Sequence, residues 1–395
     1  MNYILFDDDS RQNLLPFTHT RPVADIRCGI LTMRERWEKC LGKSTGSLTE
    51  DYMQQVFPLN SSSDNCYING GVFGSTALLA AISRLAPGQA LVKDEIVIAV
   101  WIGANEMSIS EFRRHIKTLP AQHFDGDVYA LKNVWDIFAL NDRAIKDDFH
   151  LLTRARLSAP VPAHVTVIGA EQLFIEEGAV IAPGCIINAH TGPVYIAKEA
   201  EIMEGVMIRG PLAVCEHGVL KMGAKIYGAT TIGPGCKVGG EINNVVFFAN
   251  SNKGHDGYLG NAVIGEWCNL GADTNCSNLK NNYDEVKIWS EASGAYIATG
   301  LTFCGLLMGD HSKCGINTMF NTGTVAGVSC NIFGGGFPDK HIPSFSWGGD
   351  EMTTYAFDKA METANRMMGR RSQQLSNVEI TMYRHIFDNR ESNHN

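Results

Sequence analysis

The sequence lacks features that mark several classes of protein. Its 11 cysteines include no Cys-x-x-Cys pair, and an odd number does not complete a disulfide framework. No apolar run approaches membrane-spanning length, and Asp7, Asp8 and Asp9 interrupt the apolar start, so we expect no signal peptide, no membrane partner and a cytoplasmic location. The net charge of −9 argues against a nucleic-acid partner.

Proline is scarce, whereas a short apolar repeat is prominent. The 13 prolines stand against 40 glycines, which is typical of a turn-rich β protein. An aliphatic residue recurs at every sixth position, a period far below the roughly 20 to 50 residues of helical solenoids. This period predicts a parallel β-helix whose three walls per coil send their apolar side chains into a central column. We expect the left-handed form of this fold. The core of the repeat comprises Ile196, Ile202, Ile208, Val214, Leu220, Ile226, Ile232 and Val238.

The repeat extends in both directions, with interruptions. We expect Ile175, Ile181 and Ile187 upstream, and Ile264, Leu270, Cys276, Ile297, Phe303, Ile316, Thr322 and Val328 downstream, to point inward. Two interruptions cover residues 250–257 and 280–289, and extra residues there should leave the column as loops, where function is common. A β-helix with loops of no function is the alternative.

Several cysteines share one phase of the repeat. Cys185, Cys236 and Cys268 each follow an inward aliphatic position by four residues, where a turn needs a small apolar side chain. Free cysteine behaves as a small hydrophobe. We therefore predict that these thiols are packing groups and not metal ligands.

The character of the sequence changes twice, which predicts three segments. Residues 1–152 alternate strand-like runs with helical stretches, as in an α/β domain. Residues 153–346 carry the β-helix. Residues 347–395 predict a C-terminal helix and a polar tail, with Asp350 as the helix N-cap and a stripe of Met and Phe as its packing face.

The interruption at residues 250–257 carries the strongest candidates for chemistry. His255 would project from a loop on the rigid prism that the three walls of stacked coils form. Lys253, two residues before it, is a candidate anion-binding group. Imidazole suits proton abstraction near neutral pH because its unperturbed pKa lies near about 6.5. A histidine that only satisfies the loop backbone is the alternative. Asp310 and His311 form either an orienting pair or, as we favour, a polar turn.

Residues 255–278, HDGYLGNAVIGEWCNLGADTNCSN, resemble the active-site segment of bacterial glucosamine-1-phosphate acetyltransferases. The whole chain also resembles a shorter branch of the bifunctional uridyltransferase/acetyltransferase family, whose N-terminal sugar nucleotidyltransferase domain is atypical. The segments LLPFTHTRPVADIRCG, SNLKNNYDEVKIW, GDHSKCGINTMFNTGTVAG and IPSFSWGG carry this second resemblance.

The resemblance implies acetyl transfer from acetyl-CoA to glucosamine-1-phosphate, coupled to uridylyl transfer from UTP that yields UDP-N-acetylglucosamine. His255 would be the general base that accepts the proton of the attacking amine. Tyr258 and Asn269 would contact the sugar and its phosphate, and Asn278 the region of the amine. A stacked turn ladder is the alternative for the asparagines.

The resemblance also implies a homotrimer in which acyl-CoA lies along a groove between neighbouring prisms. Arg209 matches the family's phosphate-binding arginine. Lys280 is the candidate for a lysine supplied by a neighbouring chain, although its spacing departs from the longer family's pattern. The candidate CoA contacts are Thr299, Gly300, Lys340, Arg370 and Arg371, and a solvated helix end explains the two arginines equally well.

The front domain departs further from the family pattern, because it lacks the glycine-rich loop that cradles NTP phosphates. Arg11 and Arg21 are the candidates for holding phosphates there. Asn69 stands where a metal-binding carboxylate is expected, and an amide is a weaker Mg²⁺ ligand, which leaves Asp136 as the metal candidate.

Three functions remain open on the sequence. The chain is a bifunctional enzyme, an acetyltransferase whose front domain only binds or packs, or a noncatalytic trimeric scaffold. A zinc hydratase is disfavoured, since His190, His217 and His255 lack a tight ligand spacing.

Overall fold

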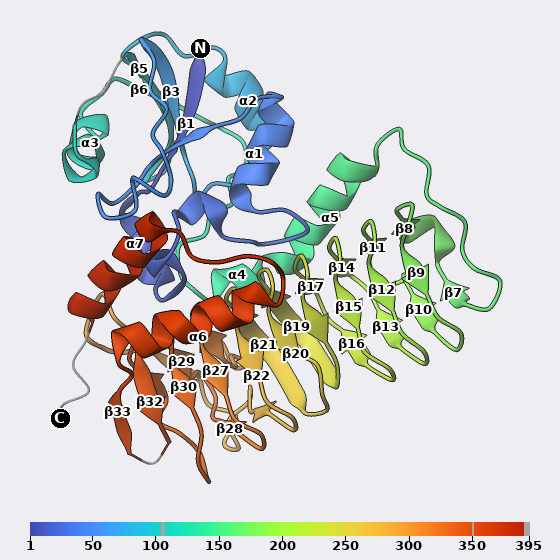
Figure 1. Cartoon of the computed structure of the whole chain (residues 1–395). Helices are drawn as coiled ribbons and strands as arrows, with labels where there is room; N and C mark the ends of the chain where they lie inside the picture. Colours follow the sequence, from blue (N-terminus) through green and yellow to red (C-terminus); the bar gives the residue numbers. More distant parts are fainter. Residues whose placement is uncertain (104–106, 350, 391–395) are drawn as a thin grey trace. The chain divides into compact units, whose positions relative to one another are not determined.

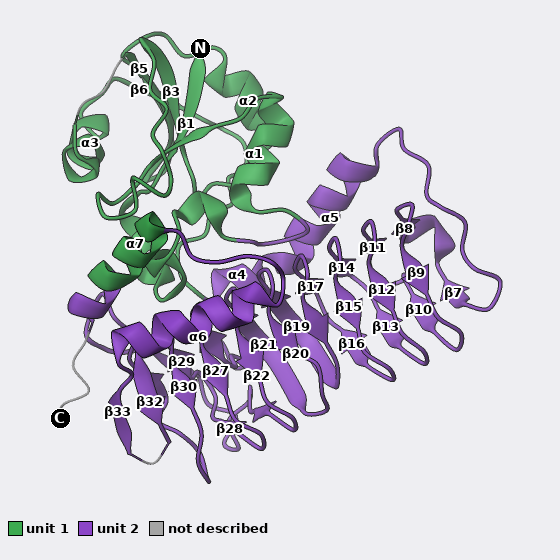
Figure 2. Ribbon diagram, in the orientation of Figure 1, with its two compact units in different colours: residues 1–26, 31–134, 377–385 green, residues 27–30, 135–376, 386–395 purple. Residues whose placement is uncertain are grey.

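The computed structural model describes residues 1–103, 107–349 and 351–390. The chain forms two compact units, each assembled from separate stretches of sequence (Figure 2). Unit 1 comprises residues 1–26, 31–134 and 377–385, and unit 2 comprises residues 27–30, 135–376 and 386–395. These units group residues 135–152 with the repeat. They are defined by contacts and do not test the predicted domain boundary at residue 152, which stays a prediction. Among the described helices, none combines the length and apolarity needed to cross a bilayer.

Unit 1 is an α/β domain built on a mixed sheet, as predicted. Strand β1 is parallel to both of its neighbours, whereas β5 is antiparallel to β3 and β4. The order across the sheet is β2 (Gly46–Leu48), β1 (Asn2–Phe6), β3 (Asp64–Asn69), β5 (Ile96–Gly103), β4 (Ala90–Lys93) and β6 (Ala121–His123).

The two faces of this sheet are covered by different helices, because strand side chains alternate between faces. Leu5 packs in one cluster with Trp37 of α1 (Met33–Leu41) and with α2 (Thr76–Ile82). Ile4 packs on the other side with Phe112 of α3 (Ile109–Ile116). Three short 3-10 helices follow β1: η1 (Asp9–Leu14), η2 (Phe17–His19) and η3 (Val23–Asp25).

Unit 2 is a parallel β-solenoid with three walls, which confirms the predicted fold (Figure 1). Wall 1 contains β9 (Val180–Ile181), β12 (Glu201–Ile202), β15 (Val219–Leu220), β18 (Lys237–Val238), β20 (Asn252–Lys253), β22 (Asn269–Leu270), β27 (Lys313–Cys314), β30 (Asn331–Ile332), β32 (Ser346–Gly348) and β33 (Met352–Thr354).

Walls 2 and 3 share two long strands, β19 (Glu241–Phe247) and β21 (Tyr258–Ile264). Wall 2 also contains β7 (Thr166–Ile168), β10 (Ile186–Asn188), β13 (Met207–Arg209) and β16 (Lys225–Tyr227), and ends in the separate pair β23 (Asn275–Cys276) and β28 (Met319–Phe320). Wall 3 also contains β8 (Leu173–Ile175), β11 (Val194–Ile196), β14 (Leu212–Val214), β17 (Thr230–Ile232), β26 (Leu307–Met308), β29 (Val325–Ala326) and β31 (His341–Ile342). The helix η4 (Ala170–Gln172) precedes β8.

The predicted column is confirmed from Ile175 to Val238 and again from Ile264 to Cys276, where every inward residue is buried in one cluster. It is wrong beyond Cys276. Phe303 and Ile316 are 47% and 68% exposed, and Ile297 lies in a hairpin. Thr322 and Val328 are buried but are two residues away from the inward phase. The column continues instead through Cys314, Phe320, Ala326 and Ile332.

The two interruptions differ in kind. Val238 pairs with Lys253 only fifteen residues later, whereas Leu220 pairs with Val238 eighteen residues later, so the first interruption is a shortened coil and not an insertion. The second is an insertion, because Leu270 pairs with Cys314. The inserted residues include the antiparallel hairpin of β24 (Lys287–Ser290) and β25 (Ala295–Ala298).

The remaining helices include α4 (Asp136–Ala139), α5 (Asn141–Thr153), α6 (Phe357–Gly369) and α7 (Asn377–Asp388). The predicted packing face of the C-terminal helix is confirmed, since Phe357, Met361 and Met368 of α6 are buried. The helix begins later than expected because β33 takes up residues 352–354. The predicted N-cap Asp350 lies outside the described residues.

Candidate functional site

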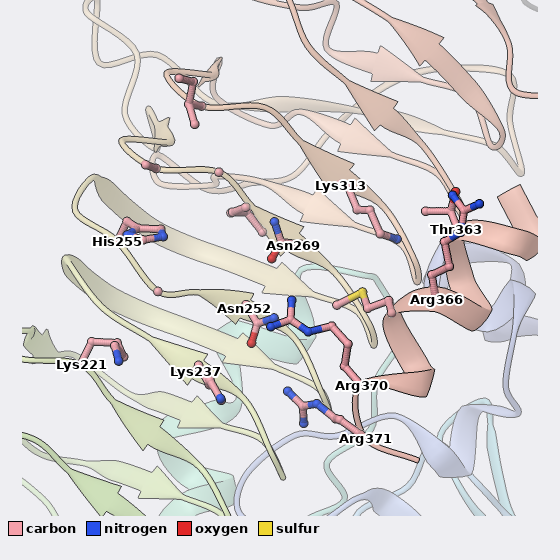
Figure 3. A pocket seen from close by; sticks show the side chains of 16 residues that line it. Lys221, Lys237, Asn252, His255, Asn269, Lys313, Thr363, Arg366, Arg370 and Arg371 are labelled. Atoms are coloured by element: carbon pink, nitrogen blue, oxygen red, sulfur yellow. The ribbon is translucent and has the colours of Figure 1, made fainter. Parts of the chain in front are cut away.

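A cavity of about 820 Å³ lies between wall 1 and α6 in unit 2. Lys237, Asn252, Asn269 and Lys313 line it from successive strands, and each stands one residue before an inward residue. Since side chains alternate along a strand, this position points outward. Figure 3 shows these side chains following one another along the wall, with residues of α6 beside them.

The lining of the cavity is strongly cationic. No Asp or Glu occurs among its lining residues, all of which belong to the described part of the chain. A concave surface with charge of one sign concentrates ions of the opposite sign. The site is therefore suited to a polyanionic ligand, although the whole chain carries a net charge of −9. The lining cations are Lys221, Lys237, Lys313, Arg366, Arg370 and Arg371.

Burial lowers the pKa of two of these cations, Lys313 and Arg371. Burial lowers the pKa of Lys313 to about 8, and its Nζ donates a hydrogen bond to the His311 carbonyl at 2.7 Å. Burial also lowers the pKa of Arg371, although that guanidinium keeps its charge at neutral pH. Arg371 is held in place, since its Nη1 donates to Asn250 Oδ1 at 2.6 Å and its guanidinium lies 5.6 Å from the centre of the Trp267 ring.

His255 lines the same cavity, at the turn between walls 1 and 2. Its side chain is exposed and lies on the side of the cavity away from α6 (Figure 3). The turn ends at Gly257, whose φ of 117° is unfavourable for residues with a Cβ. Of the predicted residues, the cavity thus brings together His255, Asn269, Arg370 and Arg371.

Asn252 adds an unused hydrogen-bond acceptor to this lining. Its Oδ1 is buried and has no hydrogen-bond partner within the described chain. Such a group costs free energy unless a ligand or water satisfies it. The sequence prediction missed Asn252, Lys221, Lys237, Lys313 and Arg366. Lys237, Asn252 and Lys313 each precede an inward residue, which is a signal that can be read only once the coils are aligned.

Lys253 does not present its ammonium to the cavity. Its side chain is buried in the prism interior, so the predicted substrate contact is wrong. Sequence reasoning placed it on an inserted loop, but the shortened coil places it at an inward position of β20.

Tyr258, Asn261 and Asn278 form a second polar group, at the start of β21. Asn278 Nδ2 donates to Tyr258 Oη at 3.0 Å and to Asn261 Oδ1 at 2.7 Å. Burial raises the pKa of Tyr258, so the phenol stays protonated at neutral pH. Tyr258 follows His255 by three residues, which places the group next to the histidine turn along the chain.

Arg209 is exposed at the end of β13, three strands from β21 in the order of the sheet. It is not among the residues that line the cavity.

The other predicted CoA contacts and Lys280 lie on or beside the insertion, not in the cavity. Lys280 pairs with Asp284 at 3.5 Å, and Thr299 Oγ1 donates to the Val286 carbonyl at 2.8 Å. The Gly300 amide donates to the Glu285 carboxylate. Lys340 Nζ donates to the Lys287 carbonyl at 2.8 Å, and burial lowers its pKa.

In unit 1, the two predicted phosphate-binding arginines are buried. Arg11 forms an ion pair with Asp7 at 3.4 Å and donates to Tyr52 Oη at 2.9 Å. Burial raises the pKa of Asp7, against the lowering effect of Arg11. Both arginines are thus buried in this structure, and their role in phosphate binding stays a prediction.

The predicted metal site is also not assembled. Asn69 Nδ2 donates to Asp8 Oδ2 at 2.7 Å, and Asn69 Oδ1 accepts from the Gly71 amide at 2.9 Å. Within the described ranges, no group of three or more His, Cys, Asp or Glu residues converges as metal ligands. Asp136 begins α4 and belongs to unit 2. Mg²⁺ is usually held by one or two carboxylates together with substrate phosphates, so its binding to the front domain stays a prediction.

Two smaller predictions concern side chains of unit 2. Asp310 Oδ1 accepts the Glu266 amide at 2.8 Å, which agrees with a polar turn. The packing role of Cys185, Cys236 and Cys268 is confirmed, because all three thiols are free and buried.

Residues 3–157 match the family described as sugar nucleotidyl transferase. The front domain belongs to that family. Over 231 residues, the chain is 24% identical to the bifunctional protein GlmU of Synechococcus elongatus, which covers 53% of this chain and 46% of that protein.

Two further relatives extend this similarity. Over 153 residues, the chain is 29% identical to the bifunctional sugar-1-phosphate nucleotidylyltransferase/acetyltransferase of Sulfurisphaera tokodaii, with 38% of each chain covered. Over 171 residues, it is 26% identical to the uncharacterized acetyltransferase YaiX of Escherichia coli, with 43% of this chain and 74% of that protein covered.

The chain thus spans less than half the length of these bifunctional relatives. The family resemblance drawn from the sequence is confirmed: a sugar nucleotidyl transferase domain is followed by a hexapeptide-repeat domain of the acetyltransferase type, with distant bifunctional homologues.

Proposed function

We propose that the protein transfers the acetyl group of acetyl-CoA to the amine of an amino-sugar phosphate, with glucosamine-1-phosphate as the substrate. The observation that carries the proposal is the position of His255 at the edge of a cationic cavity without carboxylates. Both substrates carry phosphate groups, and acetyl-CoA carries several, so such a cavity can hold the polyanion while an imidazole faces the reacting atoms.

His255 would act as the general base. The amine nitrogen attacks the thioester carbonyl, the C–N bond forms and the amine proton passes to the imidazole. The C–S bond then breaks, and the imidazolium returns the proton to the leaving thiolate. A positioned base of this kind contributes about a hundredfold or more to the rate.

The other residues of the site would bind the two substrates. Arg370 and Arg371, together with Lys237 and Lys313, would hold the phosphates of acetyl-CoA by charge. Asn269 would reach the sugar phosphate from wall 1, and Tyr258 with Asn278 would orient the sugar next to the histidine. Arg209, Lys280, Thr299, Gly300 and Lys340 lie outside the cavity, so a role for them requires a second prism of the proposed homotrimer.

A panel assay tests this function. Purified protein is mixed with acetyl-CoA and one of several acceptors: glucosamine-1-phosphate, glucosamine-6-phosphate, galactosamine-1-phosphate or unphosphorylated glucosamine. We expect release of CoA thiol with glucosamine-1-phosphate and little or none with glucosamine. No thiol release with any phosphorylated amino sugar contradicts the proposal.

A second candidate is an acetyltransferase whose front domain does not transfer nucleotides. The burial of Arg11 against Asp7 and Tyr52 favours it, because this arginine is not available to phosphates. Pyrophosphate release from UTP and N-acetylglucosamine-1-phosphate, measured with and without Mg²⁺, distinguishes the two. Mg²⁺-dependent release would establish the bifunctional enzyme and UDP-N-acetylglucosamine as its product.

A further inference from the structure

One inward position of the prism carries a charge. Wall 1 points Leu220, Val238, Lys253, Leu270 and Cys314 into the core, and only the third of these is charged. The side chain of Lys253 is 0% exposed and lies between Val238 and Leu270 along the column. Burying an ammonium there costs free energy that the aliphatic side chains at the neighbouring positions do not cost.

The buried ammonium is directed at the turn that carries His255. Lys253 Nζ donates to the His255 carbonyl at 2.8 Å and to the Asp256 carbonyl at 3.2 Å. A third contact, to the Gly239 carbonyl at 3.5 Å, connects it to the preceding coil. An ammonium has three N–H donors, and here all three meet carbonyl groups.

The same turn is also closely packed from the preceding coil. A Cβ added to Gly240 would lie 2.9 Å from the His255 carbonyl oxygen and 2.7 Å from that of Gly257. Gly240 also has a φ of 78°, where glycine is favoured. The backbone of the turn is therefore seated on Gly240 on one side and hydrogen-bonded to the Lys253 ammonium from the core.

We propose that Lys253 is a positioning residue for His255: its ammonium fixes the carbonyls of residues 255 and 256, so that the imidazole keeps one direction toward the cavity. A loop with two free carbonyls and two glycines would sample several directions, and the base would face the amine only part of the time. This inference depends on the proposed role of His255 for its effect on the reaction.

The test is Lys253→Met, which keeps the length and apolar contacts of the side chain but removes the ammonium. We expect the melting temperature to stay equal or to rise, because removal of a buried charge offsets the loss of its hydrogen bonds to the carbonyls of the turn. We expect kcat for acetyl transfer to fall between about tenfold and a hundredfold, with an unchanged KM for acetyl-CoA. Leu220→Met, on the same wall, is the matched control and should leave kcat and KM unchanged.

A readout without catalysis separates this proposal from the proposed function. Amide hydrogen exchange over residues 254–257 should be faster in Lys253→Met than in the wild type or in Leu220→Met. If the wild type transfers no acetyl group, the proposed function fails, and the exchange rates still decide whether Lys253 holds the turn. Unchanged exchange in Lys253→Met overturns the inference.

Two further outcomes also overturn it. A Lys253→Met protein that fails to fold, or whose melting temperature falls, assigns the ammonium to stability and not to position. The double variant with His255→Ala supplies the last check, because loss of positioning cannot lower the rate further once the base is absent. An additional loss in the double variant contradicts the inference.

Discussion

At the scale of single residues, the charge of Lys253 has a consequence for stability that can be measured as a function of pH. Burial lowers its pKa from 10.5 to about 8 in the folded protein. Between these values the unfolded chain binds more protons than the folded one, so the contribution of this residue to stability rises with pH. Below about pH 8 the full penalty of the buried charge remains.

We therefore expect Lys253→Met to be more stable than the wild type at pH 7, and the difference to shrink as the pH rises from about 8 to 10.5. Each pKa unit corresponds to about 1.4 kcal/mol, which limits the change to about 3 kcal/mol. Urea unfolding of both proteins at several pH values measures it. Parallel curves at all pH values would contradict the lowered pKa.

The thiols allow a second test at this scale. Of the 11 free cysteines, all but Cys40 are buried. Burial raises the pKa of Cys66, Cys236 and Cys304 to about 12, so the reactive thiolate is scarce at pH 8. We expect a thiol reagent to label one cysteine rapidly in the folded protein and all 11 after denaturation. Rapid labelling of several native thiols would show that the prism opens.

Among the cations of the cavity, Arg370 offers the clearest test of ligand binding. It lines the cavity, and within the described residues its side chain has no hydrogen bond or ion pair that the substitution would break, whereas Arg371 donates to Asn250. Arg370→Ala should raise KM for acetyl-CoA by about five- to thirtyfold, as expected for the loss of one charge-assisted hydrogen bond of about 1 to 2 kcal/mol. Arg143→Ala, an exposed arginine of α5, is the control. Equal KM values would remove the cavity from the acyl-CoA assignment.

At the scale of elements, α6 completes the cavity by placing Arg366 and Arg370 opposite wall 1. Ala364 lies on its buried face and is 1% exposed. Ala364→Asp buries an unpaired carboxylate and should release the helix. We expect weaker binding of acetyl-CoA by calorimetry, whereas Lys359→Asp on the exposed face should bind nearly as the wild type does. Equal binding by both variants would show that α6 is not part of the site.

The strands show how far the repeat could be predicted. The six-residue period identified the inward residues in the coils before the first interruption, as from Leu220 to Val238. It lost the phase after the insertion, although Cys314 again pairs with Ile332 eighteen residues later. It could not show whether a break adds or removes residues, since both shift the phase. The coil that ends at Lys253 is shortened, and this single difference moved the lysine from an expected loop into the core.

The candidate site was predicted only in part, for a related reason. His255 stood out through the interrupted repeat and then the resemblance, Asn269 through the resemblance, and Arg370 and Arg371 through the helix end. Asn252, Lys237 and Lys313 belong to the site because three coils bring them together on one wall. Their spacing along the sequence is irregular, so the alignment of the coils had to be known first.

At the scale of the whole molecule, the structural evidence for an enzymatic activity differs between the two units. Unit 2 combines an exposed imidazole with a cationic cavity. Most of unit 1 lies within residues 3–157, which match the sugar nucleotidyl transferase family, but its Arg11 is internally paired and its Asn69 is engaged with Asp8. The acetyl-transfer role therefore has the stronger structural basis, and nucleotidyl transfer depends on the UTP assay.

The central claim, that His255 is the base of an acetyl transfer, is tested most directly by the rate of His255→Ala with acetyl-CoA and glucosamine-1-phosphate. The control is His217→Ala, an exposed histidine that lies outside the cavity. We predict a loss of at least about a hundredfold in kcat for His255→Ala, with an unchanged oligomeric state, and a normal rate for His217→Ala. A His255→Ala protein with wild-type turnover would contradict the account.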